Sequence, residues 1–432
     1  MAHKGSKRLP PYRHHDLDTS KQQIRLLRIS RAAGAIHCEI SVHDIDDAPA
    51  YRALSYTWGP PEPAYNIVID NKSLAIRENL YAFLLKANKG EAQRQLASTQ
   101  YLWIDQISID QGNVSERNHQ VRLMAKIYER AAVVTMWLGD TTGPECDDGP
   151  LSLEDQNKLW TPDAVAELLR DPYFTRLWIV QEVLLNSNIE VQVRGNAQLG
   201  FDTLVSARYF WRPKLRQLGV SRNTLDLLIR YYRNGPRFGE LKQLHYLIEM
   251  FSKNKCTDLR DKVYGLVGMC NGTHDIVVDY SKSTQEVFLD VVTAFWKMFR
   301  KTRRKALKVR LPSRTYRVIL EELSKEMILE QHQQRGIRDM LWHLWVTIMP
   351  DVEDYDYSMR RFPVVTSMGF DAATTDTRSS ASLDGKLQLV PDQWWYECEK
   401  EKYVFKCVPS WRQSESKSTP FPGHFLAAAG LS

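Results

Sequence analysis

The alternation of strand-like and helix-like segments between residues 51 and 194 most constrains the fold of this chain. Short apolar runs typical of buried strands occur at Tyr51–Gly59, Tyr101–Ile104 and Val133–Leu138, and a fourth strand is expected at Ile189–Arg194. Between these runs, apolar residues recur at helical spacing in Glu78–Ala87, Val121–Ala131 and Phe174–Leu185. Strands that alternate with helices build parallel sheets, so the sequence predicts an α/β fold with a mostly parallel sheet flanked by helices.

Two hairpins are predicted, one before this alternating region and one within it. Ile24–Ile29 and Ile36–Val42 are joined through Gly34 and predict a hairpin at the edge of the domain. Asn66–Ile76 alternates apolar and polar residues on both sides of Asp70-Asn71, which is typical of a tight hairpin. Ile189–Arg194 alternates as an edge strand does.

We divide the chain into four parts on these patterns. Residues 1–20 form a basic, disordered lead-in, and residues 21–195 form the α/β domain. Residues 196–300 are mainly helical, and residues 301–432 form a mixed, poorly defined C-terminal region with a few strands. In these last two parts we expect helices at Leu225–Tyr232, Glu240–Phe251, Asp258–Met269, Tyr280–Phe299 (capped by Ser281 or Ser283) and Leu320–Gln331, and a strand at Tyr403–Val408.

Composition excludes several classes of protein. The formal net charge of +6 is mild for 432 residues and argues against a nucleic-acid-binding protein. The basic run Arg300–Arg310 is interpreted as a linker or solvated helix face in preference to a nuclear address or anion site. Six scattered cysteines without metal-ligand spacing predict reduced thiols and no metal site. No apolar run is long enough for a membrane span, so we expect a cytoplasmic protein, with the nucleus as an alternative.

Asp105 is the first candidate site residue. It directly follows the apolar run Tyr101–Ile104, and ligands of open α/β sheets bind beyond the carboxyl ends of the strands. The alternative is a carboxylate that caps the following loop or pairs with an arginine, and the residues of this stretch alone favour that structural role.

Glu182 is the second candidate. It borders the apolar face of its predicted helix, so its carboxylate must be paired, hydrogen-bonded, or protonated with a raised pKa. Arg176 on the same helix, Asp105 and Tyr56 are its expected neighbours. An ordinary salt bridge between Glu182 and an arginine is the alternative. His119 is placed on the exposed side of its helix, and the phosphate-loop, zinc-protease and nucleophile-elbow motifs are absent from the sequence.

Several blocks resemble the fungal heterokaryon-incompatibility (HET) domain, over about residues 25–195. The matching blocks are YRALSYTWG (51–59), ENL (78–80), YLWIDQISIDQ (101–111), ERNHQVRLMAKIYERA (116–131), VVTMWLG (133–139) and PYFTRLWIVQEVLL (172–185). DLRDKVYGLVGM (258–269) and VVDYSKSTQEVF are similar to the segments that usually follow. The chain departs from the family pattern at Ser108, where Cys is common, and at Asp110, where Asn is common.

This resemblance implies a cell-death effector of fungal allorecognition with a fold similar to the Toll/interleukin-1 receptor (TIR) domain. The spacing Trp178-x-x-x-Glu182 resembles the TIR motif whose glutamate is required for splitting NAD+. On this analogy Glu182 would be catalytic, NAD+ would be a substrate, and no bound cofactor is expected. Substrate contacts would come from Tyr56, Trp58 (with Trp103 as an alternative stacking ring), Asp105, Arg176 and Trp178.

The resemblance leaves two functional hypotheses open. One is a TIR-like NAD+ glycohydrolase that becomes active on self-association. The other is a non-enzymatic scaffold that self-associates and recruits an unknown protein partner, since fold similarity alone never establishes catalysis.

Overall fold

The computed structural model describes residues 9–30, 35–88, 101–139, 161–192, 198–234, 243–270, 275–305, 313–327, 386–387, 394–399 and 402–407. The chain divides into two compact units, residues 1–281 and 282–432, and each is described by itself.

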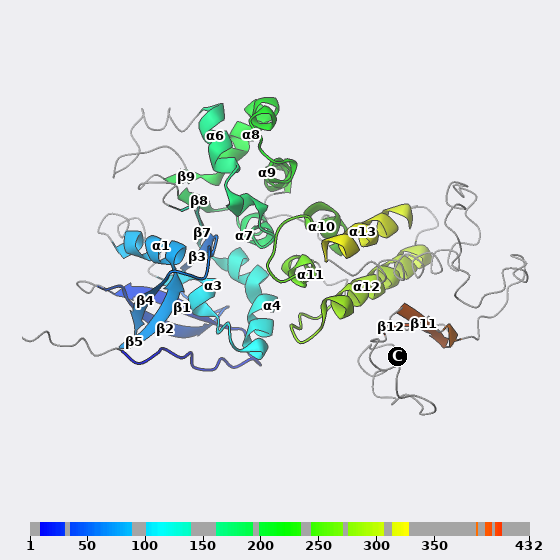
Figure 1. Ribbon diagram of the computed structural model, residues 1–432, viewed down its shortest axis with the longest axis horizontal. Helices are drawn as coiled ribbons and strands as arrows, with labels where there is room; N and C mark the ends of the chain where they lie inside the picture. The colour runs from blue at the N-terminus through cyan, green and yellow to red at the C-terminus, as the bar shows by residue number, and fades with distance from the viewer. Residues whose placement is uncertain are drawn as a thin grey trace, which may run out of the picture. The chain divides into compact units, whose positions relative to one another are not determined.

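The first unit is built on a sheet of nine described strands (Figure 1). In chain order the strands are β1 (Gln23–Ser30), β2 (His37–Asp44), β3 (Tyr51–Tyr56), β4 (Ala64–Ile69), β5 (Lys72–Arg77), β6 (Tyr101–Trp103), β7 (Val133–Trp137), β8 (Ile189–Gln192) and β9 (Gln198–Gly200). Across the sheet they follow the order β5-β4-β2-β1-β6-β3-β7-β8-β9.

The four strands β6, β3, β7 and β8 are parallel neighbours and confirm the predicted α/β core. Ala53 of β3 pairs with Trp103 of β6 on one side and with Val134 of β7 on the other, and Val134 also pairs with Ile189 of β8. The chain therefore leaves β3 toward β6 and then crosses back to β7. Such a reversal of strand order opens a crevice beyond the carboxyl ends of the strands.

The complete sheet is mixed, because antiparallel hairpins extend the parallel core. β1 and β2 pair antiparallel, and β1 also pairs antiparallel with β6, so this hairpin lies within the sheet and the edge position predicted for it is wrong. The β4–β5 hairpin forms the true edge, and its turn residues Asp70 and Asn71 have φ of 49° and 61° as a tight hairpin turn requires. β8 is not the edge strand either, since β9 pairs with it.

Helices cover the two faces of the sheet. α1 (Glu78–Asn88) buries Leu80, Phe83, Leu84 and Ala87, the face predicted from their spacing, against a core that includes Leu54 of β3. α4 (Val114–Arg130) lies on the opposite face. There the Tyr51 hydroxyl donates to the Ile127 carbonyl at 2.6 Å, and the rings of Trp103 and Tyr128 meet edge to face at 5.6 Å. Because side chains alternate along β3, Ser55 points to the same face as Tyr51.

The single helix predicted for Phe174–Leu185 is wrong, because the chain is interrupted in the middle of it. A 3₁₀ turn, η2, covers Pro172–Thr175, and α7 covers Ile179–Leu184. Between them Arg176 is extended, with φ −74° and ψ 145°. Its neighbours pair with a distant segment, since the Leu177 amide donates to the Lys255 carbonyl at 2.8 Å and the Lys255 amide donates to the Thr175 carbonyl at 2.7 Å. This pairing replaces the helical hydrogen bonds.

His119 does not lie on an exposed helix side as predicted. Its side chain is 7% exposed, and its Nε2 lies 2.8 Å from the Lys21 carbonyl oxygen. The N-terminal segment before β1 runs across this side of α4 and covers it, which helical periodicity alone does not indicate.

Further helices complete the first unit. They are α3 (Asp105–Ser108), α6 (Pro162–Leu169), α8 (Phe201–Gln217), α9 (Arg222–Asn234), α10 (Leu244–Phe251) and α11 (Asp261–Val267). The helices expected at 225–232, 240–251 and 258–269 are thus present with shifted ends. No helix in the described ranges is both long enough and apolar enough to cross a membrane.

The second unit contains α12 (Thr284–Lys305), α13 (Ser313–Glu326) and an antiparallel sheet of β10 (Lys386–Leu387), β11 (Trp394–Glu399) and β12 (Lys402–Cys407). Ser283 caps α12 as one of the two predicted candidates, because its hydroxyl accepts the Glu286 amide at 3.3 Å. The first part of the basic run, to Lys305, continues α12, and its remainder lies outside the described residues. The acidic segment 351–357 and the Ser/Thr-rich segment 374–382 also lie outside them.

Candidate functional site

Asp105 lies where β6 ends, as predicted, and is the first residue of α3. One carboxylate oxygen accepts the indole N–H of Trp58 at 2.7 Å, and the other accepts the Gln106 amide at 2.7 Å. Burial raises the pKa of Asp105 above its ordinary value, although the hydrogen bond from Trp58 acts in the opposite direction. The carboxylate therefore lies beyond the strand ends, and each of its oxygens already accepts a hydrogen bond from the protein.

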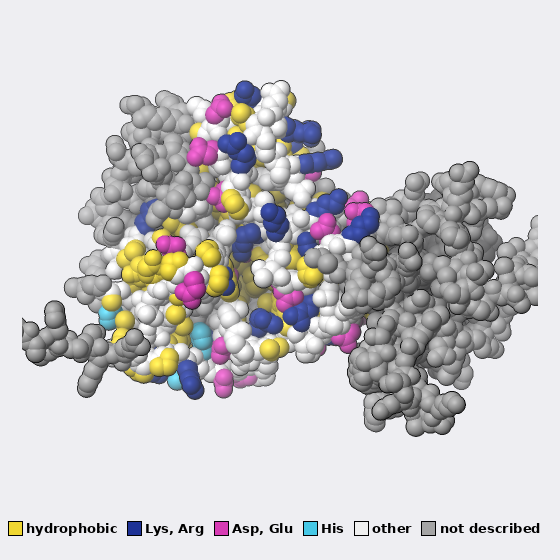
Figure 2. Space-filling view, in the orientation of Figure 1, with side chains coloured by type: hydrophobic (Ala, Val, Ile, Leu, Met, Phe, Trp, Pro, Cys, Tyr) yellow, Lys and Arg dark blue, Asp and Glu magenta, His cyan; other side chains and the backbone are white. Residues whose placement is uncertain are grey.

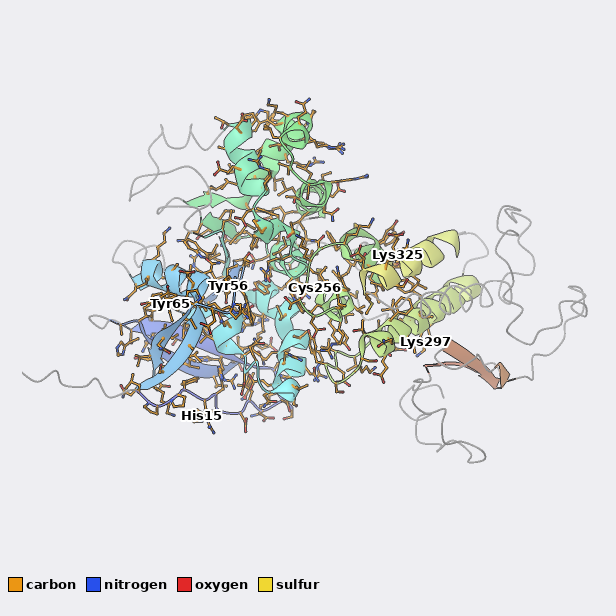
Figure 3. All side chains as sticks on the ribbon, viewed as in Figure 1. His15, Tyr56, Tyr65, Cys256, Lys297 and Lys325 are labelled. Atoms are coloured by element: carbon orange, nitrogen blue, oxygen red, sulfur yellow. The ribbon has the colours of Figure 1, made fainter. Side chains whose placement is uncertain are left out.

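Tyr56 and Trp58 come from the end of β3, next to Asp105. The Tyr56 hydroxyl donates to Gln106 Oε1 at 3.2 Å, and Tyr56 is labelled in Figure 3. The guanidinium of Arg77 lies 5.0 Å from the centre of the Trp58 ring and donates to the Gly59 carbonyl at 2.6 Å. The aromatic end of β3 is thus held between a carboxylate on one side and a cation on the other.

Asn79 ties the ends of β3 and β7 together. Its side-chain N–H donates to the Thr57 carbonyl at 2.6 Å, and its side-chain oxygen accepts the Trp137 indole N–H at 2.9 Å. Gly59 and Gly139, which follow the two strands, have φ of 72° and 91°, a left-handed conformation that glycine adopts without strain. This arrangement fixes the point at which the strand order reverses.

Glu182 is 2% exposed and faces β3. Its Oε2 accepts a hydrogen bond from the Ser55 hydroxyl, and the same hydroxyl is hydrogen-bonded to the Tyr173 hydroxyl. Nη1 of Arg176 lies 3.9 Å from Oε2. This separation is beyond hydrogen-bond distance, so Glu182 is not closed in a bidentate arginine bridge.

Arg176 connects Glu182 to the surface. Its side chain is 19% exposed, compared with 3% for Glu182, and its Nη1 is buried without a hydrogen-bond partner. The Asn254 side chain holds the Arg176 backbone by donating to its carbonyl at 3.1 Å. The extended backbone described above is therefore what places this guanidinium beside Glu182.

Burial and the neighbouring charges set the ionisation of this group. Burial raises the pKa of Glu182 to about 7, while Arg176 and the Ser55 hydrogen bond lower it and Asp105 raises it further. A carboxyl with this pKa changes its protonation within the physiological range, as functional carboxyls often do.

The face in Figure 2 is hollowed near its middle, where Figure 1 draws α3, α4 and α7, with Lys or Arg side chains beside the hollow.

Two predicted site residues make other contacts. The Trp178 indole N–H donates to Asp261 Oδ2 at 3.1 Å, so this ring is anchored to α11. Trp103, the alternative stacking ring, is fully buried against Tyr128. Of the predicted substrate contacts, the structure thus brings Tyr56, Trp58, Asp105 and Arg176 to the strand ends near Glu182.

The sequence did not single out Ser55, Tyr173, Gln106 or Arg77. Ser55 carries the clearest signal, because it is the one small hydroxyl residue within the apolar run YRALSY. Tyr173 and Arg77 carry none, since their contacts depend on segments that are distant in sequence.

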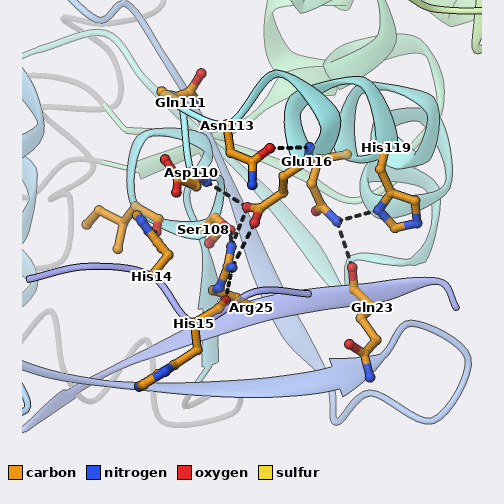
Figure 4. A network of polar contacts seen from close by, with 12 residues as sticks. His14, His15, Gln23, Arg25, Ser108, Asp110, Gln111, Asn113, Glu116 and His119 are labelled. Carbon is orange, nitrogen blue, oxygen red and sulfur yellow. Dashed lines mark hydrogen bonds and ion pairs between the residues drawn. The ribbon is translucent and has the colours of Figure 1, made fainter. Parts of the chain in front are cut away.

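A buried ion pair holds the loop that follows Asp105 (Figure 4). Arg25 of β1 donates to both carboxylate oxygens of Glu116 and to the Ser108 carbonyl at 3.0 Å. Glu116 also accepts the Asp110 amide at 2.7 Å. The Ser108 hydroxyl accepts the Ile104 amide at 3.2 Å and is buried. Ser108 and Asp110 therefore have structural roles in this loop.

Within the described part of the chain, no group of three His, Cys, Asp or Glu side chains is arranged to hold a metal ion. Cys38, Cys256 and Cys270 are free thiols, and burial raises the pKa of each to about 12. The groups at the strand ends are therefore two carboxylates with raised pKa values, one guanidinium, a phenol and an indole. This set can bind hydroxyl groups and stabilise a developing positive charge.

Comparison with known proteins identifies the α/β region. Residues 51–182 match the family model described as Heterokaryon incompatibility protein (HET). Heterokaryon incompatibility protein 6, OR allele, of Neurospora crassa is 27% identical over 369 residues, which cover 66% of this chain and 54% of that protein. Vegetative incompatibility protein HET-E-1 of Podospora anserina is 26% identical over 155 residues, which cover 35% of this chain and 10% of that protein. The chain thus spans about half the length of the first relative. No solved structure matches the chain.

Proposed function

Because this chain is a fungal HET domain protein, we propose that it acts in heterokaryon incompatibility, as an effector of allorecognition and programmed cell death. We further propose that the site around Glu182 hydrolyses NAD+ to nicotinamide and ADP-ribose. The names of the two relatives support the first part, and the geometry at the strand ends supports the second.

One observation carries the enzymatic proposal: a buried glutamate of raised pKa lies against β3, the strand at which the strand order reverses, hydrogen-bonded to Ser55 and close to Arg176. The strand order β6-β3-β7-β8 also supports the suggested likeness to the TIR fold, because it matches the first part of the flavodoxin-like order. Enzymes use carboxylates of this kind at sites where positive charge develops.

In the proposed reaction the bond between the nicotinamide nitrogen and C1′ of the ribose breaks. Its electron pair goes to the ring nitrogen, so that nicotinamide leaves as a neutral molecule. Ionised Glu182 stabilises the positive charge that develops on the ribose, as carboxylates do in glycoside hydrolysis. A water molecule adds its oxygen to C1′ and releases one proton. In this scheme Asp105 accepts a hydrogen bond from a ribose hydroxyl and the Trp58 ring contacts a flat base, and the hydrogen bond between these two side chains at 2.7 Å supports their acting together.

Arg176 has a defined part in this scheme. Its positive charge favours the ionised form of Glu182, and its Nη1, which lacks a hydrogen-bond partner, can donate to a substrate oxygen. The partial exposure of Arg176 supports a path for a substrate toward the buried glutamate.

A non-enzymatic scaffold is the second candidate. The observation that favours it is the nearly complete burial of Glu182 beneath Ser55 and Tyr173, which equally suits a carboxylate that ties α7 to the sheet. Under this proposal the chain self-associates and recruits a killing partner.

Incubation of the full chain with NAD+, free and after forced self-association, tests the two proposals. The enzyme proposal predicts nicotinamide release that Glu182→Gln abolishes and that Glu39→Gln, a change at an exposed ion pair, leaves intact. Cell killing by both wild type and Glu182→Gln, without nicotinamide from either, would reject the enzyme and support the scaffold. Loss of killing with Glu182→Gln, at unchanged thermal stability, would reject the scaffold.

A further inference from the structure

Residues downstream of the matched HET region hold the segment that carries Glu182. The Lys255 backbone pairs with Thr175 and Leu177, as described above, and the Gln181 side chain donates to the Gly265 carbonyl at 2.6 Å. The position of α7 is therefore determined from outside residues 51–182.

Asp261, the first residue of α11, holds the indole ring of Trp178 by a side-chain hydrogen bond. Its Oδ2 accepts the Trp178 indole N–H at 3.1 Å, and its Oδ1 accepts the Tyr280 hydroxyl at 2.6 Å. The ring also lies against Gly265, where an added Cβ would be 3.7 Å from Trp178 Cε3 and 3.2 Å from Leu177 Cδ2. The indole is thus fixed both by a directional hydrogen bond and by close packing.

Trp178 stands at the start of the helical turn that ends in Glu182. It is the residue that precedes α7, and its carbonyl accepts the amides of Gln181 at 3.1 Å and Glu182 at 3.4 Å. Because this turn has only six residues, the position of its first carbonyl determines where the Glu182 carboxylate meets Ser55.

We propose that Asp261 is a positioning residue of the Glu182 site: it anchors Trp178, and through Trp178 it sets the position of Glu182 against Ser55. This inference rests on the proposed NAD+ hydrolysis for its catalytic readout. It also gives Trp178 a different role from the predicted one, since the ring becomes an anchor and not a substrate contact.

The surroundings of Asp261 fit a fixed anchor. Its side chain is 7% exposed, and Tyr280, which donates to it, has two guanidinium groups close to its ring, Arg117 at 4.2 Å and Arg260 at 5.2 Å from the ring centre. Arg260 is in turn paired with Asp258 at 2.6 Å. Burial raises the pKa of Asp261 to about 7, against the hydrogen bond from Tyr280, and Asp258 raises it further. The carboxyl thus accepts one hydrogen bond from Trp178, at the start of the turn that carries Glu182, and a separate one from Tyr280 on another segment.

The test uses Asp261→Leu, which removes the acceptor of the Trp178 hydrogen bond, together with Trp178→Phe, the double variant and Tyr280→Phe, all in the full chain. Tyr280→Phe is the matched control, because it removes the other hydrogen bond to the same carboxylate and leaves the one to Trp178. We expect Asp261→Leu and Trp178→Phe each to lower kcat by about tenfold or more with little change in KM, as misplacement of a catalytic group does. The double variant should lose no more than the worse single variant.

The overturning results are equally specific. Two results would show that Asp261 does not act through Trp178. One is a double variant whose loss of kcat is the product of the losses of the two single variants, and the other is a kcat in Tyr280→Phe as low as in the variant at Asp261. Hydrogen exchange of the peptide covering residues 177–185 separates this inference from the proposed function. If the wild type releases no nicotinamide, NAD+ hydrolysis is rejected. Faster exchange in Asp261→Leu and Trp178→Phe, but not in Tyr280→Phe, would still support the anchor, and unchanged exchange would reject it.

Discussion

The Ser55 hydroxyl of β3 donates a hydrogen bond to the Glu182 carboxylate of α7, which joins the centre of the sheet to the turn that carries the glutamate. Both side chains are buried, at 1% and 2% exposure, so neither can exchange this bond for one to water. Buried polar groups in such a position depend strongly on their partners. The stability of the domain and the ionisation of Glu182 are therefore linked at one contact.

Ser55→Ala tests this link. The change leaves a buried carboxylate with one donor fewer, so we expect a loss of about 1–3 kcal/mol in the free energy of unfolding at pH 8. The loss should be smaller at pH 5, where Glu182 is protonated. Denaturant unfolding at both pH values measures it. Ser20→Ala, at an exposed Ser–Asp hydrogen bond of 2.5 Å, is the control and should have no measurable effect.

Glu182 predicts how stability depends on pH. Its pKa is raised from the ordinary 4.5 to about 7, so between these values the folded chain holds a proton that the unfolded chain has released. The free energy of unfolding should therefore fall as the pH rises from 4.5 to 7, by at most about 1.4 kcal/mol per pH unit for one group, and level off above 7.

Glu182→Gln isolates this contribution. The variant should show a shallower fall over the same pH range, and the remaining slope should come in part from Asp261, whose pKa is also raised to about 7. Identical slopes for wild type and Glu182→Gln in urea titrations from pH 4.5 to 8 would contradict the raised pKa.

Arg176→Gln should move the pH dependence upward. Removal of the guanidinium takes away a charge that lowers the pKa of Glu182, so ionisation should require a higher pH. Nicotinamide release, which needs the ionised carboxylate, should rise with pH around 7 in the wild type and at higher pH in the variant. Arg176→Lys keeps the charge and should stay near the wild type. If the chain releases no nicotinamide, unfolding still tests this prediction. The free energy of unfolding of Arg176→Gln should keep falling to a higher pH than that of the wild type.

Arg25→Met should strongly destabilise the first unit. Arg25 and Glu116 are 1% and 3% exposed, and loss of the arginine leaves a buried carboxylate without its cation. We expect a loss of about 3–5 kcal/mol. Arg28→Met is a matched control on the same strand, because Arg28 pairs with Glu39 at 2.6 Å with both side chains about half exposed, and it should change little. Comparable losses of stability in Arg25→Met and Arg28→Met, measured by thermal unfolding, would argue against a structural role for the buried pair.

A chain cut after residue 195 should not fold as a stable domain. It would contain the matched HET residues but lose Lys255, Gly265 and Asp261, which bind the segment from Thr175 to Gln181. A chain of residues 1–281, the first compact unit, should unfold cooperatively. Circular dichroism during thermal unfolding of both chains measures the difference, and equal cooperativity would show that the downstream segment is dispensable.

Local patterns predicted the elements well where each element's own periodicity determines its burial. The apolar face of α1 was confirmed in full, and Asp70-Asn71 was confirmed as the turn of a hairpin, because turn chemistry acts within a few residues. The same reasoning failed for Phe174–Leu185, where pairing with Lys255 extends Arg176, and for His119, which the N-terminal segment covers. In each case a distant segment competes with the local preference.

The candidate site divides in the same way. By itself the sequence determined the parallel α/β core, the position of Asp105 at a strand end and the unusual placement of an acid at Glu182 on an apolar face. Only the tertiary structure decided that Glu182 binds Ser55, which lies 127 residues away, that Arg176 is beside it and that Trp178 is held by Asp261. The physical reason is that side-chain periodicity records which face of an element is buried, whereas the partner on that face depends on the order of strands in the sheet.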